Sequence, residues 1–100
     1  MKRARFIPAA RLEFLAEVIY HSEVQPGLGK RFTAAVEDTA ARALAFPMSG
    51  SASRANTRRI IVKGFRFSLY YRPEPDGIVI FALAHHSRRP FYWQSRTRAR

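Results

Sequence analysis

The sequence contains no cysteine, which excludes a disulfide framework and any zinc site that uses thiolate ligands. It also lacks an apolar run near the roughly 20 residues that a membrane-spanning helix requires. The basic start MKRAR resembles the beginning of an export signal, but Pro8, Arg11 and Glu13 interrupt the apolar stretch that such a signal needs. We therefore expect a cytoplasmic protein without a membrane segment.

Acidic residues are scarce: seven Asp and Glu oppose 18 Lys and Arg, which gives a formal net charge of +11. The imbalance is concentrated in residues 51–100, where eleven basic residues face two acidic ones. Such a cationic half favours an anionic partner, either nucleic acid or an acidic protein. The last basic residues also fit a solvated tail, so we expect one domain over residues 1–95 and a basic tail over residues 96–100.

Apolar residues recur at helical spacing in two stretches, which a QPGLG turn at residues 25–29 separates. The first helix is expected from Ala9 to about Glu23, with Pro8 in its first turn. Its expected core-facing stripe is Leu12, Leu15, Ala16 and Ile19. The second helix is expected from Leu28 to Ala45, with the stripe Phe32, Val36, Ala40 and Ala43. Together the two stretches predict a helical hairpin.

Strand patterns precede and follow the hairpin. Residues 2–7 fit a short edge strand, and residues 48–56 form a small polar loop. Residues 58–62 and 65–72 fit the next two strands, and the second alternates apolar and polar side chains. A PEPDG turn leads to residues 78–85, an unbroken apolar run typical of a strand buried on both faces. The order β-α-α-β-β-β predicts an α+β domain, with the helical hairpin on one face of an antiparallel sheet.

The polar face of residues 65–72 carries Arg66, Tyr70 and Arg72. Basic residues interleaved with aromatic rings bind phosphates by charge and bases by stacking, although a solvated strand face would look similar. We therefore predict a basic surface that binds an anionic target. Its candidate residues are Arg58, Arg59, Lys63, Arg66, Arg72, Arg88 and Arg89.

The histidines do not suggest a metal centre. His85 and His86 are adjacent, so on a strand their side chains point to opposite faces, and His21 lies on a helix. We expect no metal and no cofactor. Either His85 or His86 could act as a general acid or base, or stabilise the end of the strand. No carboxylate accompanies them, because Glu74 and Asp76 fall in a turn and the helical carboxylates most simply solvate the helices.

Four motifs cover most of the chain: GLGKRFTAAVEDT at 27–39, FPMSG at 46–50, RRIIVKGFRFSLYYR at 58–72 and IVIFALAHHSRRPFYWQSR at 78–96. With these motifs in this order, the sequence resembles the RelE/ParE superfamily of bacterial toxins from type II toxin–antitoxin modules, in its ParE-like branch. The resemblance implies the same β-α-α-β-β-β fold. It also implies a toxin that an acidic antitoxin neutralises in a hetero-oligomer.

The resemblance leaves the target open between two branches. ParE-like toxins are described as poisons of DNA gyrase that are not nucleases, so the first expectation is a non-enzymatic gyrase inhibitor. RelE-like toxins cut mRNA on the ribosome, and in that alternative Arg88, Tyr92 and His85 would be the catalytic candidates. A third interpretation is a basic binding module that has lost its toxicity.

Tight neutralisation requires apolar contacts as well as charge, because an exposed ion pair contributes only about 0–1 kcal/mol. Phe14 and Val18 lie off the expected stripe of the first helix, and Phe91 and Trp93 follow the last strand. We therefore predict these four residues as apolar anchors for the antitoxin.

Overall fold

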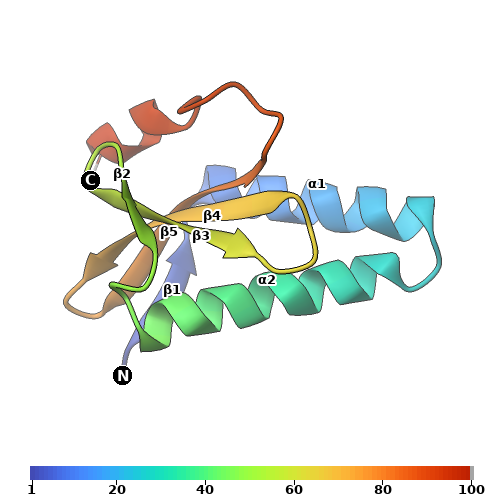
Figure 1. The fold of residues 1–100 in the computed structure, drawn as a ribbon, viewed down its shortest axis with the longest axis horizontal. Coiled ribbons are helices and arrows are strands. Elements are labelled where there is room, and N and C mark those ends of the chain that lie inside the picture. Colours follow the sequence, from blue (N-terminus) through green and yellow to red (C-terminus); the bar gives the residue numbers. More distant parts are fainter. Residues whose placement is uncertain (100) are drawn as a thin grey trace.

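The computed structural model describes residues 1–99 as two helices, five strands and a terminal 3-10 helix (Figure 1). Their bounds are β1 Arg3–Phe6, α1 Pro8–Val24, α2 Leu28–Ala45, β2 Ser51–Ser53, β3 Thr57–Val62, β4 Phe67–Glu74, β5 Gly77–His85 and η1 Gln94–Ala99. The predicted order of elements is confirmed, and α2 has the predicted bounds. β2 is an additional short strand inside the expected loop at residues 48–56. Arg100, the end of the expected tail, lies outside the described residues.

The five strands form one sheet in the order β1-β5-β4-β3-β2. Strands β2 to β5 pair antiparallel, as predicted, whereas β1 runs parallel to β5 and makes the sheet mixed. Parallel strands need a long connection, and the helical hairpin together with strands β2 to β4 provides it between β1 and β5. At this junction Gly77 has a φ of +140°, and a Cβ there would collide with the backbone of Arg3.

The helical hairpin covers one face of the sheet, and the main core lies between these two layers (Figure 1). The predicted alternation along β4 is confirmed, because Phe67, Leu69 and Tyr71 point into this core. The predicted stripe of α2 is confirmed as well: its buried residues include Phe32, Val36, Ala40 and Ala43. β5 is buried along nearly its whole length, as its apolar run predicts.

The orientation of α1 differs from the prediction. Leu12, Leu15 and Ile19 are 68%, 48% and 60% exposed, and Ala16 is also exposed. The opposite side of the helix contacts the core through Ala10, Phe14, Val18 and His21. Two ring contacts explain this choice: the Phe14 ring lies 5.5 Å from that of Phe6, and the His21 ring stacks on Phe32 at 4.3 Å between centroids.

Candidate functional site

The segment after β5 crosses the sheet on the face opposite the hairpin (Figure 1). The chain turns back at Phe91, whose φ is +58°, and places Trp93 against Tyr70 with 4.5 Å between ring centroids. Trp93 is 1% exposed. This corrects two expectations: the polar face of β4 is partly covered, and Trp93 is a core residue with no free surface for an antitoxin.

A pocket of about 130 Å³ lies where this segment leaves β5, and we call it the basic pocket. Its lining combines the cations Arg59, Arg88 and Arg89 with the imidazole of His86 and aromatic walls. The aromatic lining residues are Tyr70, Phe91, Tyr92 and Trp93. Cations above stacking rings suit an anionic group attached to a flat or apolar body.

A chain of hydrogen bonds orients His86 in the basic pocket. The Nε of Arg59 donates to Oγ of Ser68 at 3.1 Å, and that hydroxyl lies 3.0 Å from Nε2 of His86. Because Arg59 can only donate, the Ser68 hydroxyl is free to donate its own proton to Nε2. Ser68 is fully buried, so this relay fixes the imidazole relative to the guanidinium.

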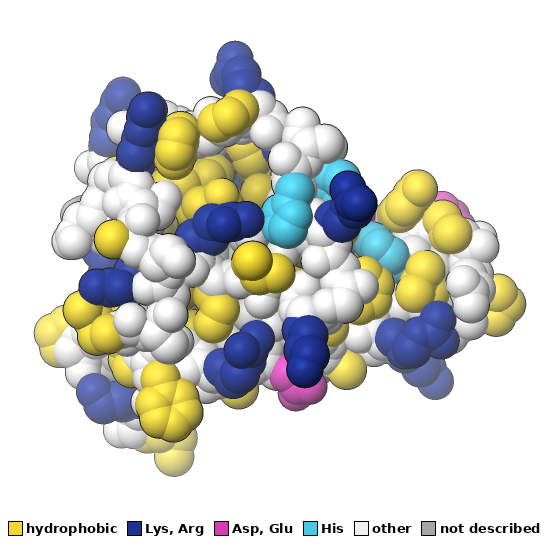
Figure 2. Space-filling model, in the orientation of Figure 1, with side chains coloured by type: hydrophobic (Ala, Val, Ile, Leu, Met, Phe, Trp, Pro, Cys, Tyr) yellow, Lys and Arg dark blue, Asp and Glu magenta, His cyan; other side chains and the backbone are white. Residues whose placement is uncertain are grey.

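The molecular surface shows the same combination of basic and apolar side chains that lines the basic pocket. Figure 2 shows dark blue Lys and Arg side chains over much of the viewed face, while magenta Asp and Glu side chains are rare there. Cyan histidines lie among the basic side chains, and a hollow lined by yellow hydrophobic side chains lies beside them. The face therefore presents positive charge next to apolar surface.

Glu13 lies at the centre of a second polar group. Its Oε1 accepts hydrogen bonds from Arg96 at 2.9 Å and from the backbone N–H of Leu83 at 3.2 Å. Its Oε2 accepts from the hydroxyl of Tyr92 at 2.5 Å and from Arg96 at 3.1 Å. Arg96 also donates to the carbonyl oxygen of Phe81 at 2.9 Å. We call Glu13, Tyr92 and Arg96 the edge cluster.

The edge cluster exists because β5 extends beyond its partner β1, whose pairing ends at Ile80. The carbonyl of Phe81 and the N–H of Leu83 then need partners other than a strand. Glu13 and Arg96 supply them. Two expectations are therefore wrong: Glu13 does not merely solvate its helix, and Arg96 is not part of a solvated tail.

The hydroxyl of Tyr92 is held as a hydrogen-bond donor. Burial raises the pKa of Tyr92 well above its ordinary value of 10.0, and the hydrogen bond to the Glu13 carboxylate raises this pKa further. The guanidinium of Arg88 lies 3.9 Å from the centre of the Tyr92 ring. Tyr92 therefore stays protonated at neutral pH, and Arg88 stacks on its face.

Two of the predicted anion-binding residues hold backbone instead. Arg58 donates to the carbonyl of Gly50 at 2.7 Å, and Arg72 donates to that of Ala55 at 2.5 Å and that of Asn56 at 3.1 Å. Both guanidiniums thereby fasten the chain around β2. Both side chains keep their positive charge, but these N–H groups donate to backbone carbonyls of the protein itself.

The single basic surface predicted from the sequence is divided. Lys63 lines a groove beside α2, and Arg66 lines a pocket on the hairpin side of the sheet. The structure brings together Arg59, Arg88 and Arg89. Strand geometry accounts for part of this division, because consecutive residues such as Arg58 and Arg59 point to opposite faces.

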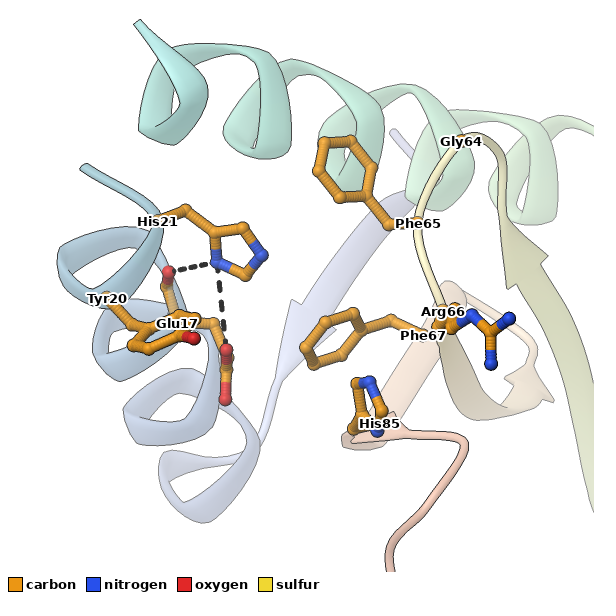
Figure 3. A pocket seen from close by; sticks show the side chains of 8 residues that line it. All are labelled: Glu17, Tyr20, His21, Gly64, Phe65, Arg66, Phe67 and His85. Carbon is orange, nitrogen blue, oxygen red and sulfur yellow. Dashed lines mark hydrogen bonds and ion pairs between the residues drawn. The ribbon is translucent and has the colours of Figure 1, made fainter. Parts of the chain in front are cut away.

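The pocket on the hairpin side has a volume of about 470 Å³ (Figure 3). It is lined by Glu17, Tyr20, His21, Gly64, Phe65, Arg66, Phe67 and His85. Figure 3 shows His21 reaching from α1 toward Phe65 and Phe67, while the Arg66 guanidinium points away from the rings. Nδ1 of His21 lies 2.6 Å from the carbonyl oxygen of Glu17, so this imidazole is tied to its own helix.

His85 and His86 point to opposite faces, as predicted. The ring of His85 lies 5.0 Å from that of Phe67 on the hairpin side, whereas His86 contacts Ser68 on the other side. Nδ1 of His85 accepts a hydrogen bond from the backbone N–H of Ser87 at 3.1 Å. His85 therefore stabilises the end of its strand.

Residues 1–99 contain neither a cluster of metal ligands nor a membrane-spanning helix. No group of three or more His, Asp or Glu side chains is placed there to hold a metal ion. None of the helices in this range is long and apolar enough to cross a membrane.

The remaining predicted antitoxin anchors are partly accessible. Phe14 and Val18 are half-buried against the core, and Phe14 also lines an apolar groove of about 510 Å³ between α1, α2 and β1. Phe91 is half-buried beneath the guanidinium of Arg54, which lies 4.0 Å from the ring centre. The exposed apolar face of α1 was missed as a surface because its spacing fits a core-facing stripe equally well.

A comparison with protein families agrees with the sequence motifs. The family described as the ParE toxin of the type II toxin–antitoxin system parDE matches residues 8–90. No curated protein matches the sequence. The matched range contains both helices, strands β2 to β5 and all three arginines of the basic pocket. This chain belongs to the ParE toxin family of type II toxin–antitoxin systems, and it has a cognate antitoxin as its partner.

Proposed function

We propose that this toxin inhibits DNA gyrase by binding and does not cleave RNA. The observation that carries the proposal is the edge cluster. Cleavage of RNA by its own 2′-hydroxyl requires a group that removes the hydroxyl proton. Tyr92 keeps its proton because its pKa is raised, and the Glu13 carboxylate already accepts four hydrogen bonds. Neither is available as that base.

The basic pocket is the proposed contact with the target. Its three arginines and His86 offer donors to an anionic group on gyrase or on the DNA that gyrase holds. Arg59 and His86 are oriented through Ser68, so part of the site is formed before binding. Preorganised donors bind with less loss of side-chain entropy.

The direct test is the ATP-dependent supercoiling of relaxed plasmid by gyrase in the presence of the purified toxin. We expect supercoiling to stop, and we expect the paired variant Arg88→Ala with Arg89→Ala to raise the required toxin concentration about tenfold. Arg42→Ala is the matched control, because it removes an exposed cation from α2 and should leave inhibition unchanged. Normal supercoiling at a large molar excess of folded toxin would exclude this target.

A ribosome-dependent endoribonuclease of the RelE type is the second candidate. One observation favours it: the imidazole of His86 lies in the same pocket as three arginines, and imidazole is the commonest general base in enzymes. Primer extension on mRNA from translating ribosomes tests this candidate. Cuts at fixed codon positions that disappear with His86→Ala would replace the gyrase proposal, whereas intact mRNA is the expected result.

A further inference from the structure

The outer face of α1 is apolar. Five large side chains that are 48% to 68% exposed follow it for most of its length, and we call them the α1 stripe: Leu12, Leu15, Ile19, Tyr20 and Val24. A surface helix normally turns its charged residues to the solvent and its apolar residues to the core. In α1 both sides are apolar, so this helix has a second face suited to burial.

Few charges accompany the α1 stripe. Glu13 is turned toward Arg96, and Glu17 lies beside His21. The exposed charges of α1 are Arg11 near its first turn and Glu23 near its end. Within residues 1–99 neither of these two makes a salt bridge. The stripe is therefore bounded by one positive end and one negative end.

We propose that the α1 stripe is the interface of a homodimer, in which α1 of one copy packs antiparallel to α1 of a second copy. The charges beside the stripe favour a second copy of this chain over an acidic antitoxin. An acidic antitoxin is attracted to basic surface, yet the exposed charges beside the stripe are one positive and one negative, Arg11 and Glu23. A second copy offers the same apolar stripe together with charges of opposite sign at opposite ends.

The antiparallel direction follows from the positions of those charges. Arg11 and Glu23 are twelve residues apart, which is about 18 Å along a helix. Antiparallel packing places the Arg11 end of each copy beside the Glu23 end of the other, whereas parallel packing would bring like charges together. Leu15 and Ile19 then lie near the two-fold axis, and the small side chain of Ala16 lets the two helices approach closely.

The dimer also keeps the strongest positive charge apart. The helical hairpin covers one face of the sheet, and the basic pocket lies on the other. Two chains with a net charge of +11 each would therefore meet through their least basic surfaces. Their basic pockets would face outward, so that one dimer could engage two anionic sites.

The expected association is reversible and depends on concentration. Stable protein interfaces bury about 1,200–2,000 Å² in total, and one helix face from each copy provides less than that. Sedimentation velocity from low micromolar to near-millimolar protein is therefore the suitable measurement. The mass should rise from 11.5 kDa toward twice that value.

Stripe variants test the surface. Leu15→Glu and Ile19→Glu should remain monomeric over the whole range, because each places carboxylates in the apolar centre of the interface. Ile61→Glu is the matched control: Ile61 is an exposed apolar residue on the sheet, so the variant should dimerise like the unaltered chain. Circular dichroism of all variants checks that the fold is retained.

Charge exchange tests the antiparallel direction. Arg11→Glu and Glu23→Arg alone should each weaken the dimer about three- to tenfold, and the two together in one chain should restore it. An unaltered chain that stays monomeric at every concentration would overturn the proposal, as would a double variant no tighter than the single ones. If stripe variants instead lose the antitoxin while the unaltered toxin is monomeric, the face belongs to the antitoxin and the homodimer is wrong.

Discussion

Glu13 accepts hydrogen bonds from Tyr92, Arg96 and the backbone of β5, and its side chain is 15% exposed against 22% for Arg96. Removing one charge from a largely buried pair leaves the other without a partner. We expect Glu13→Gln to lower the free energy of unfolding by about 2–3 kcal/mol, as measured by urea denaturation. Glu23→Gln, on the exposed side of the same helix, should change it by less than about 0.5 kcal/mol. Equal losses in both variants would contradict the structural role of the edge cluster.

The raised pKa of Tyr92 makes stability depend on alkaline pH. The folded chain holds the phenol proton above pH 10, whereas the unfolded chain releases it near its ordinary value of 10.0. The stabilisation is therefore fully present below pH 10 and is lost as the pH rises further. Urea denaturation at a series of pH values from 8 to 11 should show this decline. Tyr92→Phe removes the titrating group and should show a flatter profile; identical slopes would contradict the assignment.

At the scale of the elements, substitutions on the two sides of α1 test which side of this helix packs against the core. Phe14 packs against the rings of Phe6 and Phe32, so Phe14→Ala should lower the free energy of unfolding by about 2–4 kcal/mol. Leu12→Ala, in a side chain that is mostly exposed, should change it by less than about 0.5 kcal/mol. Thermal or urea denaturation of the two variants compares the faces directly. A larger loss from Leu12→Ala would mean that the stripe expected from the sequence faces the core after all.

Helical spacing predicts where α1 lies in the sequence, but it does not predict which side of α1 faces the core. The positions of both helices and of the main strands follow from period and turn signals, as α2 and β4 show. α1 carries apolar residues at helical spacing on two sides, and spacing alone does not rank them. The decision depends on Phe6 and Phe32, which belong to other elements, and on a histidine that stacks as an aromatic ring.

The candidate site was predictable only in part for a related reason. The pair Arg88 and Arg89 after the last strand was found from composition, and both line the basic pocket. Trp93 covers the sheet because the chain turns back at Phe91, which has a positive φ. A glycine would signal such a turn in the sequence, and this position has none. The edge cluster joins residues about 80 positions apart, and its cause is an unpaired strand edge that no local pattern reveals.

At the scale of the whole molecule, the basic pocket and helix α1, which carries three carboxylates, lie on opposite sides of the sheet. We expect the association rate of an acidic antitoxin to fall as salt rises, because mobile ions screen exposed charges over about 8–10 Å. The dissociation rate should change little, because it depends on apolar contacts. Surface plasmon resonance of the complex at several salt concentrations separates the two rates.

The apolar part of that complex is tested by Phe91→Ala, which removes a half-buried ring beside the basic pocket. It should speed dissociation of the antitoxin, whereas Phe46→Ala, an exposed ring at the end of α2, should not. An unchanged dissociation rate for Phe91→Ala would exclude this ring as an anchor. Trp93 is unsuitable for the test, because its removal would leave a cavity in the fold.

The parallel pairing of β1 with β5 joins the first strand of this sheet in sequence order with the fifth. While a nascent chain still lacks β5, β1 has no neighbour, β4 has an open edge, and the hairpin has only part of its sheet to cover. Pairings so distant in the chain form late, since the loop must close before the contacts form. His86, Arg88 and Arg89 follow β5 directly, so the basic pocket is completed only after β5 and the segment behind it have been synthesised. A chain that terminates before β5 therefore carries the helices of this toxin without its basic pocket.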